Sequence, residues 1–176
     1  MIRTLVIGLV TATAMAITPA TALLAAEPEA KPHTVACLKK AAEMHQAKTA
    51  LGQLAGDRGA NPRIRQFGLQ LASAHKKLSE EVQGLATTKG VPLSSELNDE
   101  HKQKVKEFSQ LSGHAFDREY MAYILRDHQN SANEFEEHLQ AVEDLEVLHW
   151  IARTLPLLRA HVEEARGLKY AMQTTP

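Results

Sequence analysis

Apolar residues recur along most of the chain at intervals of three and four positions, which is the spacing of one face of an α-helix. The clearest case begins at Gly113 and runs to about Glu143, with no further Gly or Pro inside it. His128 stands in this face where an apolar residue is due, and Asp117 is a favourable N-cap. The pattern predicts a long amphipathic helix with one imidazole directed at the core. Its apolar face consists of Met121, Ile124, Ala132, Phe135, Leu139 and Val142.

The same spacing predicts four further helices with ordinary start and stop signals. Gly56-Asp57-Arg58-Gly59 ends the first of them, and Asn61-Pro62 begins the next with an N-cap followed by a proline at the first helical position. Pro156 lies inside the last helix, where it predicts a kink or a break because the residue before a proline disfavours helical angles. The predicted ranges are Val35–Gly56, Pro62 to the turn at Gly90, Ser95–Leu111 and Leu145–Tyr170.

No part of the sequence shows the alternating apolar and polar residues, bounded by hairpin turns, that indicate β-strands. There is no internal repeat, and the connections between the predicted helices are short. We therefore expect an all-α fold in which the four long helices form an antiparallel bundle. Segment 95–111 is the extra short helix of this bundle.

The N-terminal segment has the organisation of an export signal. Met1-Ile2-Arg3 is a short basic start, residues 4–16 are apolar or small without a charge, and an A-x-A cleavage motif ends at Ala22. A membrane anchor is the alternative, but a span needs about 20 apolar residues, and threonines and Pro19 interrupt this segment. We expect a cleaved signal peptide over residues 1–22, a periplasmic location, and no stable membrane span after cleavage.

After cleavage about 154 residues remain, which corresponds to one ordinary domain. We expect a disordered leader over residues 23–34, the bundle over residues 35–170, and a disordered tail over residues 171–176. The formal net charge of the whole chain is -1, which gives no electrostatic basis for binding nucleic acid or anionic lipid. Because Cys37 is the only cysteine, there is no internal disulfide, and stability must come from a packed core.

Three of the long helices each carry a histidine on the apolar face: His75, His128 and His161. Converging imidazoles would bind Zn, Cu, Fe or Ni and leave a fourth coordination position open. His45 lies on the border of the apolar face of the first helix. Each ligand would need a hydrogen bond to its second ring nitrogen. The carboxylates nearest in sequence, which we consider as those partners, are Asp127, Glu134, Glu164 and Glu80.

The alternative is that these histidines are polar residues of the core that set the register of the helices. They would then bond to neighbouring carboxylates, to Tyr120 or Tyr123, or to one another, because buried polar groups are almost always hydrogen-bonded. Both interpretations stay open at this point, because the depth of each histidine along the bundle cannot be determined from its helix alone.

Catalytic signatures have little support. A di-iron centre in a helical bundle uses two Glu-x-x-His pairs, and the sequence contains one, Glu146–His149. Cys37 lies in the first turn of a helix, where a thiol can be reactive, although a buried thiol is the commoner state. There is no Gly-x-Ser-x-Gly elbow and no Gly-rich phosphate loop. The sequence therefore favours a protein that is not an enzyme.

Several segments resemble the bacterial family called domain of unknown function 4142, over roughly Cys37 to Leu168. The matching segments are LGQLAGDRGANPRIRQFGLQLASAH (Leu51–His75), Gly90-Val91-Pro92, LSGHAFDREYMAYILRDH (Leu111–His128) and RTLPLLRAHVEEAR (Arg153–Arg166). The most specific positions are Gly113, Phe116, Asp117, Tyr120, and Leu155-Pro156 with His161. The resemblance implies a ferritin-like bundle in exported proteins with no established activity.

The family histidines carry over to His75, His128 and His161. Two departures remove carboxylates from their surroundings, because Ala74 replaces the aspartate that usually precedes the first of these histidines, and Lys48 occupies an acidic position of the first helix. We expect an exported bundle with a non-enzymatic role in binding a metal or small ligand, or in envelope stress. The alternatives are a metal-dependent redox or storage protein, and a structural module that forms homo-oligomers.

Overall fold

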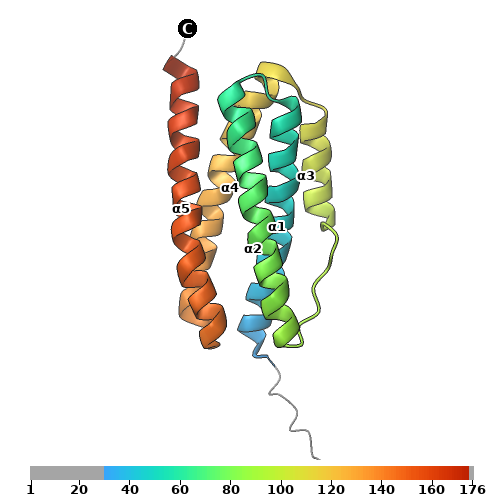
Figure 1. Cartoon of the computed structure of the whole chain (residues 1–176), viewed down its shortest axis with the longest axis vertical. Coiled ribbons are helices and arrows are strands. Elements are labelled where there is room, and N and C mark those ends of the chain that lie inside the picture. Colours follow the sequence, from blue (N-terminus) through green and yellow to red (C-terminus); the bar gives the residue numbers. More distant parts are fainter. Residues whose placement is uncertain (1–29, 175–176) are drawn as a thin grey trace, which may run out of the picture.

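The computed structural model describes residues 30–174, which form a bundle of helices (Figure 1). Residues 1–22 of the predicted signal peptide, most of the predicted leader and the last two residues lie outside the described part of the chain. The all-α prediction is confirmed, with four long helices and one short helix. The helices are α1 (Pro32–Arg58), α2 (Pro62–Thr88), α3 (Asp99–Ser109), α4 (Gly113–Ala141) and α5 (Leu145–Thr174).

Most helix boundaries differ from the sequence-based expectation by two to four residues. α3, predicted over Ser95–Leu111, spans Asp99–Ser109, because the side chain of Asn98 caps its first turn by accepting from the backbone N–H of His101. α1 begins at Pro32, a favourable first helical residue, and Thr34 is buried. Residues 32–34 of the predicted leader and residues 171–174 of the predicted tail are therefore helical. α5 continues through Pro156 without a break.

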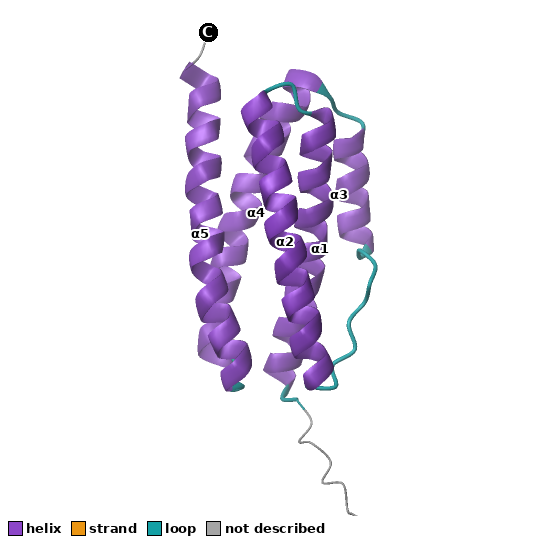
Figure 2. Ribbon diagram, viewed as in Figure 1, coloured by secondary structure: helices purple, strands orange, loops and turns teal. Residues whose placement is uncertain are grey.

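The four long helices are antiparallel to their neighbours. In Figure 1 α1 rises, α2 and α4 descend, and α5 rises again. The long connection through residues 89–98 and α3 runs back along the outside of the bundle, as Figure 2 shows, and so allows α2 and α4 to point the same way. A backbone bridge between Gly59 and Gly113 places the end of α1 beside the start of α4. This is the bundle architecture with one crossover connection.

Asp117 is not the N-cap of α4, and that prediction is wrong. The helix begins four residues earlier at Gly113, and the Asp117 carboxylate is buried in its second turn. It accepts hydrogen bonds from the backbone N–H groups of Ala60 (3.2 Å) and Asn61 (2.9 Å). These two donors belong to the turn between α1 and α2 and have no helical partner, so the carboxylate fastens this turn to α4.

The apolar core has two clusters with a polar layer between them. One cluster includes Trp150 and Phe135, and the other includes Phe67 and Tyr120. On each long helix a histidine separates the residues of the two clusters. These four residues, which we call the histidine layer, are His45 in α1, His75 in α2, His128 in α4 and His161 in α5.

A close approach of α1 and α2 sets the geometry of this layer. A Cβ atom added to Gly52 would lie 2.5 Å from the Gly68 carbonyl oxygen, so only glycine permits this separation. His45 precedes Gly52 by seven residues and His75 follows Gly68 by seven, so the two histidines lie opposite each other on the antiparallel helices. The helices are therefore near enough for the two imidazoles to bond directly.

Within residues 30–174, no helix is long and apolar enough to cross a membrane.

Candidate metal centre

The three histidines predicted as ligands meet in the middle of the bundle. One nitrogen from each of His75, His128 and His161 lies within 4.8 Å of the other two. The ring centroids of His161 are 5.4 Å from those of both His75 and His128. His75 and His128 are fully buried, whereas His161 is partly exposed. The three histidines therefore lie at nearly the same depth along the bundle, which could not be determined from each helix alone.

His45 is a fourth member of the layer that the sequence argument did not include among the candidates. Its Nδ1 lies 2.8 Å from Nδ1 of His75, and its side chain has no exposed area. The missed signal was the spacing of Leu38, Ala41, His45 and Lys48, which follows one helix face without interruption. His45 is thus central to the inner face of α1, not at its border.

The hydrogen bonds of the layer determine which nitrogens carry hydrogen. Nδ1 of His128 is 2.9 Å from the carbonyl oxygen of Ile124, which can only accept, so this nitrogen is the donor. Nε2 of neutral His128 is then a bare acceptor, and it faces Nε2 of His75 at 3.1 Å. Within the layer, Nε2 of His45 and Nδ1 of His161 are buried without a hydrogen-bond partner in residues 30–174, as are several side-chain atoms outside the layer.

Burial keeps all four imidazoles neutral. It lowers the pKa of His45 to about 3 and that of His161 to about 4. It also lowers the pKa values of His75 and His128 well below the ordinary value. The positive charge of Lys48 contributes to each of these decreases. Neutral imidazole is the form that binds metal ions, so the layer needs no net loss of protons at neutral pH.

Lys48 forms a buried ion pair one turn from His45. Its Nζ lies 2.6 Å from Oδ2 of Asp127 and donates a hydrogen bond of 2.8 Å to Oγ of Ser131. The lysine side chain is 2% exposed and that of Asp127 is 25% exposed. Burial lowers the pKa of Lys48, while Asp127 opposes that decrease. The pair replaces the carboxylate that the family resemblance led us to expect at position 48.

Within residues 30–174, none of the four carboxylates that we considered as partners forms a hydrogen bond with a histidine of the layer. Asp127 binds Lys48, and Glu134 lies 3.9 Å from Lys40. Glu80 and Glu164 line separate surface pockets. The imidazoles bond to one another and to a backbone carbonyl instead. Mutual bonding was one of the arrangements considered for core histidines.

The nitrogen positions suit a tetrahedral or trigonal metal ion. Zn–N bonds of 2.0–2.1 Å at tetrahedral angles separate two ligand nitrogens by about 3.3 Å. The 3.1 Å between Nε2 of His75 and Nε2 of His128 is close to this separation. His161 has to move inward, and no hydrogen bond restrains its Nδ1 within the described chain. Three neutral imidazoles with one position open form a known ligand set for Zn and related ions.

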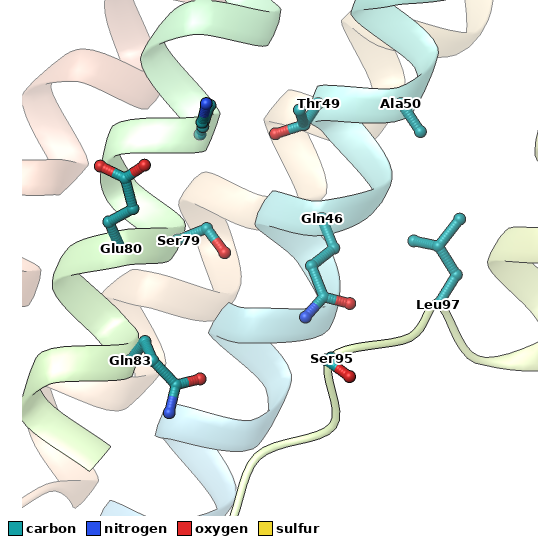
Figure 3. Close-up of a pocket in the computed structure, with 9 residues that line it drawn as sticks. Gln46, Thr49, Ala50, Ser79, Glu80, Gln83, Ser95 and Leu97 are labelled. Carbon is teal, nitrogen blue, oxygen red and sulfur yellow. The ribbon is translucent and has the colours of Figure 1, made fainter. Parts of the chain in front are cut away.

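The other groups considered for chemistry lie outside the layer. Glu146, at the start of α5, forms an ion pair with Lys89, and the sequence contains no second Glu-x-x-His pair that could complete a di-iron centre. Cys37 is fully buried, and burial raises its pKa to about 12, so its thiol stays protonated. A shallow surface groove of about 600 Å³ lies between α1, α2 and the segment before α3 (Figure 3). Its lining is mostly neutral and includes none of the four histidines.

The chain is similar to one protein family in sequence and to one solved structure in fold. No curated protein matches the sequence. A crystal structure of a DUF305 fragment from Deinococcus radiodurans is similar, with a TM-score of 0.72 and 16% sequence identity over 82% of this chain and 99% of that chain. This similarity confirms the helical fold. Residues 19–168 match the family described as Domain of unknown function (DUF4142). The chain therefore belongs to the DUF4142 family.

Proposed function

We propose that this protein binds one first-row transition metal ion inside its bundle through His75, His128 and His161. The observation that carries the proposal is the approach of one nitrogen from each ring to within 4.8 Å of the other two. The three residues come from three different helices, so an ion at this place would connect α2, α4 and α5. Its role is binding or storage of the ion, with the fourth coordination position available to a small ligand.

The unsatisfied nitrogens of the layer support a ligand role over a purely structural one. A buried polar atom without a partner costs about 1–3 kcal/mol. Nδ1 of His161 is such an atom within the described chain. An ion would give this ring a bond when it turns inward, whereas a role in helix register alone leaves this nitrogen without a partner. The proposal therefore accounts for a feature that the core interpretation leaves unexplained.

The composition of the site limits the ion. Imidazole nitrogens suit Zn, Cu, Fe and Ni, whereas Mg, Ca and Mn prefer oxygen ligands. No carboxylate in residues 30–174 is hydrogen-bonded to a ring of the layer. For divalent ions we expect the affinity to follow the order Cu above Zn and Ni, with Mn far below.

Titration of the purified, metal-free protein with Zn²⁺, Cu²⁺, Ni²⁺ and Mn²⁺ tests this function. We expect one equivalent of Zn²⁺ or Cu²⁺ per chain by calorimetry and elemental analysis. His128→Ala should weaken binding by more than the 10–100-fold typical of losing an outer-shell contact, because it removes a ligand. His149→Ala changes an exposed histidine of α5 and is the matched control. Absence of binding in the unmodified protein, or equal affinity in His128→Ala, would contradict the proposal.

We also propose that the protein is exported to the periplasm. The basic start, the uncharged residues 4–16 and the A-x-A motif ending at Ala22 support a cleaved signal peptide. Expression of the full chain followed by N-terminal sequencing should give a mature protein that begins near Leu23. An intact Met1 in the membrane fraction would show that the segment acts as an anchor.

A further inference from the structure

His45 occupies a position in the histidine layer that the three proposed ligands do not explain. It contacts the site through one bond, from its Nδ1 to Nδ1 of His75. Phe135 and Trp150 pack nearly perpendicular to its ring, with centroids 6.3 Å and 5.9 Å away. The ring is therefore held in place by apolar neighbours while its polar atom is directed at a proposed ligand.

In the metal-free protein the hydrogens of the layer have one consistent arrangement. His128 donates from Nδ1 to Ile124, so its Nε2 is bare. Two bare nitrogens 3.1 Å apart would repel, so His75 carries its hydrogen on Nε2 and donates it to His128. Nδ1 of His75 is then bare and must accept a hydrogen from Nδ1 of His45.

Binding of an ion at Nε2 of His75 would reverse two of these assignments. To bind an ion, His75 must present a bare Nε2, and a neutral ring then carries its hydrogen on Nδ1. That hydrogen is donated to Nδ1 of His45, which must be bare, so His45 carries its own hydrogen on Nε2. Nε2 of His75 loses one proton, the Nδ1 proton of His45 crosses to Nδ1 of His75, and the buried Nε2 of His45 takes up one proton. The number of protons on the three rings does not change.

We propose that His45 is a positioning residue that accepts the Nδ1 hydrogen of His75 when an ion is bound, and that its tautomer changes with metal binding. This inference rests on the proposed function. In most metal sites a carboxylate or a carbonyl fills this role and fixes the orientation of the ligand ring. Here the nearby carboxylate, that of Asp127, is paired with Lys48, and an imidazole bonds to the ligand instead.

Two replacements of His45 separate positioning from packing. Asn places an acceptor oxygen near the position of Nδ1, whereas Leu fills the space without an acceptor. We expect His45→Leu to weaken Zn²⁺ binding by about 10–100-fold, the usual effect of losing such a partner. His45→Asn should recover most of this loss. A residue that acted only through packing would show no recovery with Asn.

Nitrogen-15 NMR of the histidine rings tests the tautomers in the unmodified protein and requires no variant. On addition of Zn²⁺ the hydrogen of His75 should move from Nε2 to Nδ1, and that of His45 from Nδ1 to Nε2. If Zn²⁺ binds while the tautomer of His45 is unchanged, or if His45→Leu binds as tightly as the unmodified chain, His45 has no such role and the metal site stands. If the unmodified protein binds no ion, the proposed function fails and the inference fails with it.

Discussion

Lowering the pH from 8 to 5 in the absence of metal is expected to remove at least about 6 kcal/mol from the free energy of unfolding. His45, His75 and His128 are fully buried, and burial lowers the pKa of each in the folded state well below the ordinary value near 6.5. The pKa of the partly exposed His161 is lowered as well, so this residue adds to the loss. In the unfolded chain they regain that ordinary value and bind protons as the pH falls. At pH 5 this favours the unfolded state by about 2 kcal/mol for each histidine.

The sign follows from the number of bound protons. Between the lowered folded pKa and pH 6.5 the unfolded state binds more protons than the folded state, so stability rises with pH in this window and is lost as the pH falls. Since domains are stable by about 5–15 kcal/mol, a loss of this size brings the protein close to unfolding near pH 5.

Denaturation by urea at several pH values, with a chelator present, measures this dependence. His45→Asn removes one of the three buried imidazoles and should reduce the loss between pH 8 and pH 5 by about 2 kcal/mol. His149→Asn changes an exposed histidine of the same chain and should leave the slope as it is. A free energy of unfolding that is constant from pH 8 to pH 5 would mean that the histidines are not held neutral in the folded protein.

The parts of the fold that depend on one helix at a time were predictable from the sequence. The three-to-four spacing identified all five helices, and Asn61 caps α2 by accepting from the backbone of Arg63 as expected. The inward direction of His75, His128 and His161 was predictable because helical spacing determines which residues share the apolar face. These features are local, so the residues that determine them are neighbours in the sequence.

Features that depend on two helices were not predictable in this way. Asp117 looked like a cap within its own helix, yet its partners are backbone groups 56 and 57 residues away. The pairing of Lys48 with Asp127 and that of His45 with His75 depend on how far α1 is displaced along its neighbours. The close contact of Gly52 with Gly68 sets that displacement between α1 and α2, and its effect appears only when the helices are packed.

Asp127→Ala is expected to destabilise the protein by about 3–5 kcal/mol, because it leaves the buried ammonium group of Lys48 without its counter-charge. Ser131 would still accept one hydrogen bond but supplies no negative charge. Denaturation at neutral pH measures the loss. Glu134→Ala is the matched control, since Glu134 pairs with Lys40 across the same two helices at the exposed surface. An exposed pair of this kind contributes about 0–1 kcal/mol.

A second variant shows whether the loss comes from the unpaired charge. Lys48→Met keeps the length of the side chain without the charge, and buried ion pairs replaced by apolar groups often lose little stability. In this background Asp127→Ala should cost far less than in the natural chain, and the difference is the coupling energy of the pair.

The pKa of Lys48 is already lowered by burial, and the loss of Asp127 lowers it further. The unfolded chain then holds the proton more tightly, so the stability of Asp127→Ala alone should rise as the pH is raised above neutrality. Equal costs of Asp127→Ala in both backgrounds would show that the aspartate acts through α4 itself and not through the buried lysine.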